Sequence, residues 1–326
     1  MNRLSVRAVF DLSFVGLSLA GLALASVATL ATAQAGKTLR LVSGVTPGSA
    51  SDTVARLLTD KLSAQLGQPV IVENRLGAGG VIAAAYVAKA DPDGNTIIVY
   101  TSAYTLAALI NPGTLEAKDL APVATLGIVP TVMVTSKPYK ALSELVAAAK
   151  AKPGGVVGVS AGVGSSTHMN LERFRIAAGI DVLHIPTKGT NEALTEVLTG
   201  RADFYFSPVF AVGGQIKEGK MHALAMGSPT RSSMMPGVAT TVELGFPDSE
   251  YNFWIGALAS SKTPREIIGR LNREFNSAVQ APETRERYAK IGTEPLTMSV
   301  DEFQALIDRE LKANARIVKE AGIKAN

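Results

Sequence analysis

Short apolar runs alternate along the chain with segments in which apolar residues recur at helical spacing. After candidate N-cap residues Ser51 and Asp52, the apolar residues Val54, Leu58 and Leu62 predict a helix. Strands are predicted at Leu39–Val42, Val70–Val72, Thr96–Tyr100, Val156–Ser160, Val182–Ile185 and Phe253–Ala259. Further helices are predicted at Val81–Lys89, Leu142–Lys150, Thr167–Ala178 and Asn191–Leu198. This alternation predicts parallel α/β sheets with helices on both faces.

Two regions of the pattern carry additional local signals. The apolar stretch Val123–Thr135 predicts a strand with a break near Gly127. Thr263 followed by Pro264 and, three residues after the threonine, an acidic residue predicts a helix with threonine as N-cap and proline as its first residue. Ser299 and Glu302 have the spacing of a capping box at the start of the last helix.

The first 35 residues have the pattern of an export signal. Arg3 and Arg7 precede an uncharged apolar stretch that ends in the small residues Ala33, Gln34 and Ala35. This predicts a signal peptide cleaved after residue 35 and a periplasmic protein. A transmembrane anchor is the alternative, because the uncharged stretch is long enough to span a bilayer. A lipid anchor is excluded, because lipidation requires a cysteine and the chain has none.

Composition narrows the classes of function. The 326 residues are 47% hydrophobic and 18% charged, which predicts a folded chain of two domains. With no cysteine, the protein has no disulfide, thiol nucleophile, iron–sulfur cluster or cysteine-bound zinc, and three histidines offer little for another metal site. A net charge of +4 without a basic run does not indicate nucleic-acid binding. We therefore expect no cofactor, no metal and no nucleic-acid partner.

Three loops rich in Gly, Ser or Thr follow predicted strands and precede predicted helices: residues 46–52, 160–167 and 186–190. Open α/β sheets bind ligands beyond the carboxyl ends of their strands. Glycine allows close backbone approach, and the N–H groups of a helix N-terminus favour an anion. The loops could therefore hold an organic acid without an arginine clamp. The alternative is that they are ordinary strand-to-helix turns.

A serine hydrolase is the enzymatic alternative. Gly158–Gly162 matches G-x-S-x-G around Ser160, and Asp203 and His222 follow in the order found in α/β-hydrolases. However, a nucleophile elbow needs a helix directly after the serine, and residues 163–165 intervene here. The glycine cluster 77–80 lacks the later glycine of a dinucleotide fingerprint, so we interpret it as a turn.

Several segments, taken together, resemble the solute-binding receptors of bacterial tripartite tricarboxylate transporters, the Bug family. The most distinctive is Gly67–Arg75 followed by Gly77–Gly80. The other matching segments are Ser51–Arg56, Asp91–Gly94, Gly164 and Ser165 with His168, Ile185–Gly189, Gly219 with Lys220, and Glu243–Pro247. They are spread over essentially the whole chain after residue 35.

The resemblance implies a type II periplasmic-binding-protein fold, in which two α/β lobes are joined by two crossing strands. One lobe would comprise 36–126 and 251–326, and the other 127–250. It also implies a monomeric, non-catalytic receptor that passes a small carboxylate to membrane transporter subunits. The family's ligand-binding positions correspond to Pro47, Gly48, Ser49, Asp52, Ser102, Ala103, Gly162, Gly164, Ser165, Ser166, His168, Thr187 and Asp203.

Two positions depart from the family's usual pattern. Ser49 stands where a second glycine is usual, and Thr187 stands where tyrosine is typical. The loss of the tyrosine's bulk suggests a site that accepts a larger carboxylate, including an aromatic one. A ligand sensor for a signalling partner is a further alternative that the sequence does not separate from a transport receptor.

Overall fold

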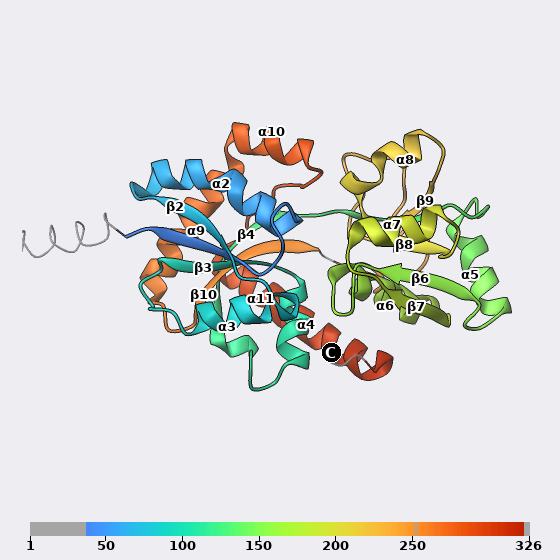
Figure 1. The fold of residues 1–326 in the computed structure, drawn as a ribbon, viewed down its shortest axis with the longest axis horizontal. Helices are drawn as coiled ribbons and strands as arrows, with labels where there is room; N and C mark the ends of the chain where they lie inside the picture. The colour runs from blue at the N-terminus through green and yellow to red at the C-terminus, as the bar shows by residue number, and fades with distance from the viewer. Residues whose placement is uncertain (1–36, 252, 323–326) are drawn as a thin grey trace, which may run out of the picture.

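The computed structural model describes residues 37–251 and 253–322, which fold into two lobes (Figure 1). In these residues, each lobe contains a five-stranded sheet. The first sheet has the order β2 (Val70–Asn74), β1 (Leu39–Ser43), β3 (Thr96–Thr101), β10 (Trp254–Ser260), β4 (Leu120–Ile128). The second has the order β7 (Val182–Pro186), β6 (Val156–Ser160), β8 (Phe204–Pro208), β5 (Thr131–Thr135), β9 (His222–Met226).

Each sheet is mixed, which corrects the prediction of purely parallel sheets. In the first sheet β10 runs antiparallel to both of its neighbours, and in the second sheet β5 does so. Each of these strands comes directly from the other lobe, whereas the other strands of its sheet run toward that lobe. The crossing of the chain between lobes therefore fixes the one reversed strand in each sheet.

Helices cover both faces of each sheet. In the first lobe these are α2 (Ala50–Leu66), α3 (Val81–Ala88), α4 (Ala103–Ile110), α9 (Arg265–Gln280), α10 (Pro282–Lys290) and α11 (Val300–Ala321), with short 3-10 turns at Ala78–Gly80 and Ala117–Asp119. In the second lobe they are α5 (Leu142–Ala151), α6 (Ser166–Ala178), α7 (Thr190–Leu198) and α8 (Gly213–Lys217), with a 3-10 turn at Val209–Ala211. Trp254 packs against Phe303 of α11 at 5.1 Å between ring centres. Burial of these apolar faces is the main force that holds each lobe together.

Two predicted boundaries differ from the structure. The strand predicted over 123–135 with a break near Gly127 is two strands. The break falls slightly later than predicted, because the chain leaves the first sheet at Val129 and Pro130, and proline lacks the N–H that a ladder requires. Pro264 is the N-cap of α9 rather than its first residue, because its ψ of 140° is extended. The capping box of Ser299 and Glu302 is confirmed, with Glu302 N–H donating to Ser299 Oγ at 3.2 Å.

The two crossing segments lie side by side between the lobes. Val129 N–H donates to the Phe253 carbonyl at 2.9 Å. The buried side chain of Asn170 in α6 contacts both segments of the second lobe that lead to the crossing. Its Oδ1 accepts from Thr131 Oγ1 at 2.6 Å, and its Nδ2 donates to the Gly227 carbonyl at 3.2 Å. Helix α6 is thus fixed to the place where the chain changes lobes.

The C-terminal helix α11 extends from the first lobe to α6 of the second (Figure 1). A buried ion pair joins them, with Arg173 Nη2 at 2.7 Å from Glu310 Oε2. Burial raises the pKa of Glu310, and Arg173 acts in the opposite direction. One turn further along α11, Asn314 accepts from Arg173 and donates to Thr105 of α4. This polar network connects the lobes on one flank.

Within residues 37–251 and 253–322, no helix has the length and apolar character needed to cross a membrane. The predicted signal peptide, residues 1–35, lies outside the described residues.

Replacing Arg173 by methionine should destabilise the protein by about 3–5 kcal/mol, because it leaves the Glu310 carboxylate buried without its cation. Urea unfolding measures this loss. The control is Arg316→Met on α11, the helix of Glu310, where the pair of Arg316 with Glu320 is largely exposed and its loss should cost under about 1 kcal/mol. Equal losses of unfolding free energy in the two variants would show that the Arg173–Glu310 pair contributes no more than an exposed ion pair.

Candidate functional site

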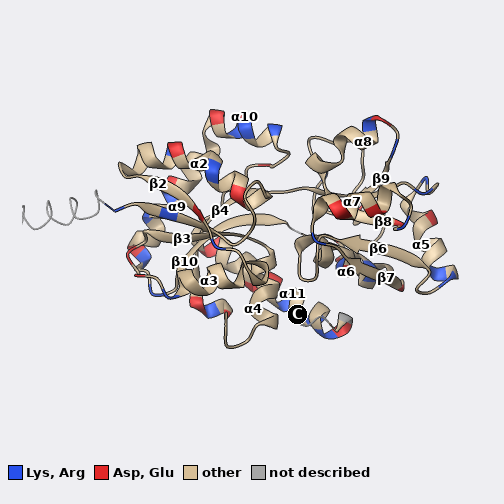
Figure 2. Ribbon diagram, in the orientation of Figure 1, with Lys and Arg blue, Asp and Glu red and all other residues tan. Residues whose placement is uncertain are grey.

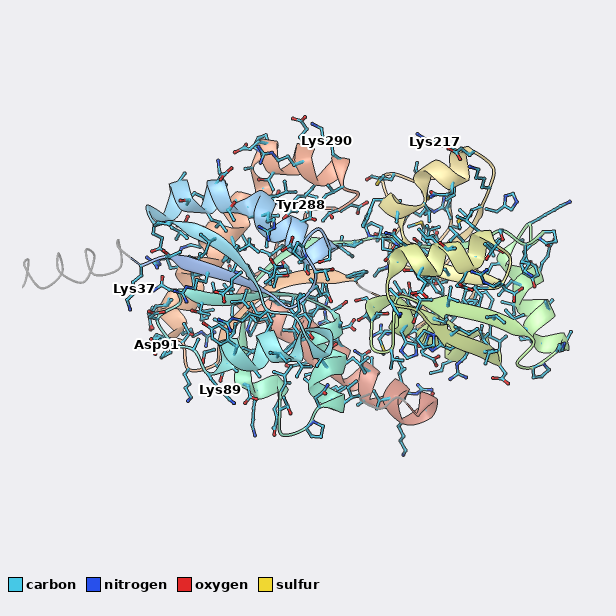
Figure 3. The ribbon with its side chains drawn as sticks, viewed as in Figure 1. Lys37, Lys89, Asp91, Lys217, Tyr288 and Lys290 are labelled. Atoms are coloured by element: carbon cyan, nitrogen blue, oxygen red, sulfur yellow. The ribbon has the colours of Figure 1, made fainter. Side chains whose placement is uncertain are left out.

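The carboxyl ends of the parallel strands in both sheets face the opposite lobe. Strand β4 leads directly into the second lobe, and β1, β2 and β3 run in the same direction as β4. In agreement, Lys37, just before β1, lies at the end of the first lobe that is remote from the second (Figure 3). By the same reasoning β6 and β7 end facing the first lobe. The loops that follow β1, β3, β6 and β7 therefore belong to one region between the lobes.

The loop after β1 is held by a buried carboxylate. Asp52, fully buried in the first turn of α2, accepts from Gly48 N–H at 2.9 Å, from Arg56 Nε at 2.9 Å and from Asn74 Nδ2 at 2.7 Å. Burial opposes ionisation, but these hydrogen bonds outweigh it and lower the pKa of the Asp52 carboxyl. Asp52 therefore shapes the loop, and its oxygens are already occupied by donors of the protein.

The helix that follows this loop starts two residues earlier than predicted, with Ser49 as N-cap. Gly48 has a φ of 84°, a left-handed conformation that glycine adopts without strain. Ser49 makes no side-chain capping bond, and its buried Oγ has no hydrogen-bond partner in the described residues. The first turn of a helix also has N–H groups without intrahelical acceptors. This end of α2 therefore has donors available for an anion.

The glycine cluster 77–80, interpreted from the sequence as a turn, supports that loop. A Cβ on Gly44 would lie 2.5 Å from Cα of Gly80, so the two backbones touch and neither position has room for a side chain. Tyr100 at the end of β3 donates its hydroxyl to the Gly79 carbonyl at 2.6 Å. The cluster thus packs beneath the ends of β1 and β3.

The loop after β3 meets the second lobe directly. Buried Ser102 lies with its Oγ 3.3 Å from the Oγ of Ser166, at the start of α6. The phenol of Tyr251, in the second crossing segment, is buried next to both serines, and this burial raises its pKa. Ala103, the neighbour of Ser102, donates its N–H to Thr101 Oγ1 at 3.3 Å. The predicted residues Ser102 and Ser166 are therefore brought together across the lobes.

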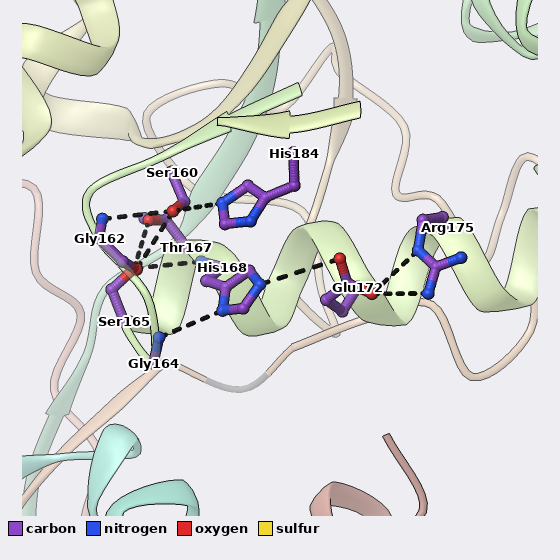
Figure 4. Close-up of polar contacts among 9 residues, drawn as sticks. All are labelled: Ser160, Gly162, Gly164, Ser165, Thr167, His168, Glu172, Arg175 and His184. Carbon is purple, nitrogen blue, oxygen red and sulfur yellow. Dashed lines mark hydrogen bonds and ion pairs between the residues drawn. The ribbon is translucent and has the colours of Figure 1, made fainter. Parts of the chain in front are cut away.

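The loop after β6 is built from glycine and hydroxyl residues (Figure 4). Gly162 and Gly164 have φ values of 128° and 79°, so this path is available only to residues without a Cβ. Ser165 is the N-cap of α6, and its Oγ accepts from His168 N–H at 3.2 Å. Thr167 Oγ1 accepts from Ala161 N–H at 2.9 Å, closing the loop on itself.

Thr187 joins the loop after β7 to the loop after β6. Its N–H and its Oγ1 both bond the Ser160 carbonyl, at 2.9 and 2.8 Å, and Oγ1 also lies 3.0 Å from the Gly189 carbonyl. Thr187 thus lies beside Gly162, but its hydroxyl is engaged with the backbone. It contributes a small side chain to the site rather than a free donor.

Two histidines stack beneath the loop after β6. The rings of His168 and His184 lie 4.1 Å apart at 12°, and His168 is 4% exposed. Burial lowers the pKa of His168 to about 3, with smaller contributions from His184 and Arg175. Burial also lowers the pKa of His184 to about 4. Both rings are therefore neutral at pH 7.

The structure contradicts the placement of Asp203 in the site. Asp203 precedes β8, and its carboxylate accepts from Val157 N–H at 2.8 Å, near the start of β6. Val157 lies near the start of β6, whereas residues 160–166 lie at its carboxyl end and in the loop that follows. The reason is that Asp203 lies before its strand, whereas the other predicted site residues follow theirs.

The arrangement predicted for a serine hydrolase is not assembled. Ser160 is fully buried, whereas a nucleophile elbow exposes its serine. Asp203 lies at the far end of β6, and His222 is exposed at the start of the edge strand β9. Ser160 Oγ instead lies 2.8 Å from Nε2 of His184.

Four contributors to the site were not predicted in these roles: Arg56, Asn74, His184 and Tyr251. Arg56 and Asn74 fall inside segments that carried the family resemblance, which was the available signal. His184 and Tyr251 come close to the loops only through the pairing of β6 with β7 and through the crossing segment. No local sequence pattern marks either contact.

The loops carry little charge of their own. Residues 43–51, 101–115 and 160–171 contain no Lys, Arg, Asp or Glu. Lys188 is exposed, and its N–H donates to Glu192 at 2.8 Å. Figure 2 shows charged residues mainly on the outer helices and turns, with the strands largely free of them. The field at the site therefore comes mainly from helix N-termini and from hydroxyl and amide dipoles.

Two α/β lobes, two crossing segments and facing strand-end loops define the two-lobed periplasmic binding proteins, and the fold is the type II form expected from the sequence. A family model described as "Tripartite tricarboxylate transporter family receptor" matches residues 54–323. The chain belongs to this family, the Bug proteins, whose members are solute-binding receptors and not enzymes.

Three relatives illustrate the similarity. Protein BugT of Bordetella pertussis is 35% identical over 292 residues, covering 88% of this chain and 90% of BugT. A solved R. palustris structure with adipate is 28% identical, with a TM-score of 0.76, and covers 89% of this chain and 98% of that one. MatC of Rhodopseudomonas palustris with bound malate is 29% identical, with a TM-score of 0.74, and covers 86% and 99%.

Asp52→Asn should destabilise the protein by about 2–3 kcal/mol, because the amide cannot accept from all the donors that surround it and Arg56 loses a charged partner. Thermal and urea unfolding measure the change. Asp60→Asn, at an exposed position of the same helix, is the matched control and should stay within about 0.5 kcal/mol of the original protein. A similar effect of both substitutions would refute the loop-shaping role.

Stability should fall as the pH is lowered from 6.5 to 5. The ordinary histidine pKa is 6.5, and that of His168 in the folded protein is about 3, so only the unfolded chain gains this proton in that window. Each such histidine contributes a slope of at most about 1.4 kcal/mol per pH unit to the free energy of unfolding. Urea unfolding at several pH values measures it. His168→Asn should flatten the slope. A slope unchanged by His168→Asn would contradict this assignment.

Proposed function

We propose that this protein binds a small organic acid between its lobes in the periplasm and delivers it to a tripartite tricarboxylate-type membrane transporter. The adipate and malate in the two R. palustris structures support a small dicarboxylate as the ligand class. The predicted signal peptide supports the location. Family membership supports the transporter as the partner.

The observation that carries the proposal is the pair of helix N-termini at facing strand ends. Helix α2 begins at the loop after β1, and α6 begins at the loop after β6, each beside buried hydroxyl groups. N–H groups and the helix dipole favour a carboxylate at such an end. Two such ends from different lobes suit a ligand with an acidic group at each end. Binding to both would draw the lobes together.

We assign residues to the ligand from their place in the loops at the facing strand ends. In the first lobe, these are the loop 47–49, with the unpaired Oγ of Ser49, and Ser102 and Ala103 after β3. In the second lobe, they are Gly162, Ser165 and Ser166. Asp52 and His168 hold these loops from behind. Thr187 lies beside them as a small residue, and this supports our hypothesis that the site accepts a larger or aromatic carboxylate.

Calorimetry and thermal shift with malate, adipate, citrate, aspartate and benzoate test the proposal. At least one acid should raise the melting temperature, because a ligand that binds only the folded state stabilises it by about 2.7 kcal/mol at 100 times its Kd. Stabilisation by aspartate alone would remove the hypothesis of a larger site. No binding of any acid would overturn the proposed class of ligand.

Ser49→Ala should weaken acid binding by about three- to tenfold without lowering the stability of the free protein, because Ser49 Oγ has no partner within the described residues. Calorimetry measures the affinity. Thr59→Ala, further along α2, is the matched control and should leave affinity unchanged. An unchanged Kd in Ser49→Ala would exclude this hydroxyl as a ligand contact.

Delivery to the transporter is tested by deleting the gene in the cell. The cell should then lose uptake of the bound acid, and returning the gene should restore it.

A further inference from the structure

Two imidazole rings are among the groups that hold the loop 162–166. His168 Nδ1 accepts from Gly164 N–H at 3.2 Å, so that amide is engaged within the protein (Figure 4). His184 Nε2 lies 2.8 Å from Ser160 Oγ, which in turn bonds Gly162 at 3.1–3.2 Å. Each histidine therefore fixes one of the two glycines that have positive φ in this loop.

The contact with Gly164 specifies the tautomer of His168. Because Nδ1 accepts a hydrogen bond, the proton of the neutral ring is on Nε2, which lies 3.9 Å from Oε1 of Glu172. Glu172 is itself paired with Arg175 at 2.9 Å. His184 covers the ring of His168 on one side. The ring is thus oriented by groups from α6 and β7, and its one acceptor atom points at the loop.

Hydrogen bonds that order a binding loop in advance increase its affinity for the ligand. A segment rich in glycine loses much conformational entropy when it is ordered, and this cost reduces affinity if the ligand has to order the loop. A loop that is already ordered avoids that cost. With Gly164 N–H engaged, the amides at the start of α6 are the donors that remain for a ligand. Their direction depends on the path of residues 162–165.

We propose that His168 and His184 are positioning residues that hold the loop 162–166 in its ligand-binding conformation without touching the ligand. This inference rests on the proposed function, since it concerns affinity for an acid. The stacked histidines then contribute to ligand affinity, a role that the fold alone would not require. The Gly164 N–H, which is bonded to His168, is not a ligand contact.

The experiment compares variants that keep or lose the acceptor atom. Asn at position 168 can place its Oδ1 near the position of Nδ1, whereas Leu has similar size and no acceptor. At position 184, Gln keeps a polar group that can bond Ser160 Oγ, whereas Leu has none, so His184→Gln and His184→Leu form the corresponding pair. The affinity for malate and adipate is measured by calorimetry, and amide hydrogen exchange is measured across residues 160–168. Circular dichroism and melting temperature report whether each variant is folded.

We expect His168→Leu to weaken binding by about tenfold, the effect of one ordinary hydrogen bond, and to speed exchange at Gly164. His168→Asn should keep affinity within about threefold and retain the slow exchange. If His168→Leu does not fold, His184→Leu and His184→Gln provide the test. His184→Leu should weaken binding and speed amide exchange at Gly162, and His184→Gln should do neither. Equal affinity and equal exchange in the Leu and amide variants would overturn the inference.

The two proposals fail in different ways. If the unaltered protein binds none of the acids, the proposed function fails, while exchange at Gly162 and Gly164 still shows whether the histidines order the loop. If the unaltered protein binds an acid and the Leu variants bind it equally well, the proposed function stands and the positioning role is wrong.

Discussion

The chain passes between its two lobes twice, and this constraint determines the directions of the strands and the positions of the loops that follow them. A strand that arrives from the other lobe must run opposite to strands that point toward it, so β5 and β10 are the reversed strands. The remaining strands of both sheets then end at the interface between lobes. The loops after β1, β3, β6 and β7 face one another for this reason, before any side chain is considered.

The electrostatics follow from this geometry. An anion placed between the lobes would meet helix N-termini and hydroxyl groups, and the surrounding loops carry few charged side chains. The carboxylate of Asp52 lies close to this region, yet Gly48, Arg56 and Asn74 compensate its charge. On the opposite lobe, the two imidazoles behind the loop 162–166 are neutral. Recognition by dipoles suits a receptor that has to release its ligand again.

The sequence was sufficient for the features that depend on local patterns. Apolar runs located most of the strands to within a few residues, although β9 was not predicted, and the motif at Ser299 located the start of α11. The three loops were recognisable because glycine and hydroxyl residues follow strands and precede helices. Asp203 was assigned to the site through the family resemblance, and its place before β8 puts it at the opposite end of the sheet. The stacking of His168 on His184 could not be predicted, because the register of β7 against β6 decides it.

The order of strands in the first sheet has a consequence for how the protein folds as it is made. Strand β10 lies between β3 and β4, but it follows the entire second lobe in sequence. The first lobe therefore cannot close its sheet until the last quarter of the chain has arrived, whereas the second lobe is formed by continuous sequence. Until then β3 and β4 each have an edge without its partner, and unpaired edges invite aggregation. The export that we propose would therefore favour a chain that stays unfolded until it has crossed the membrane completely.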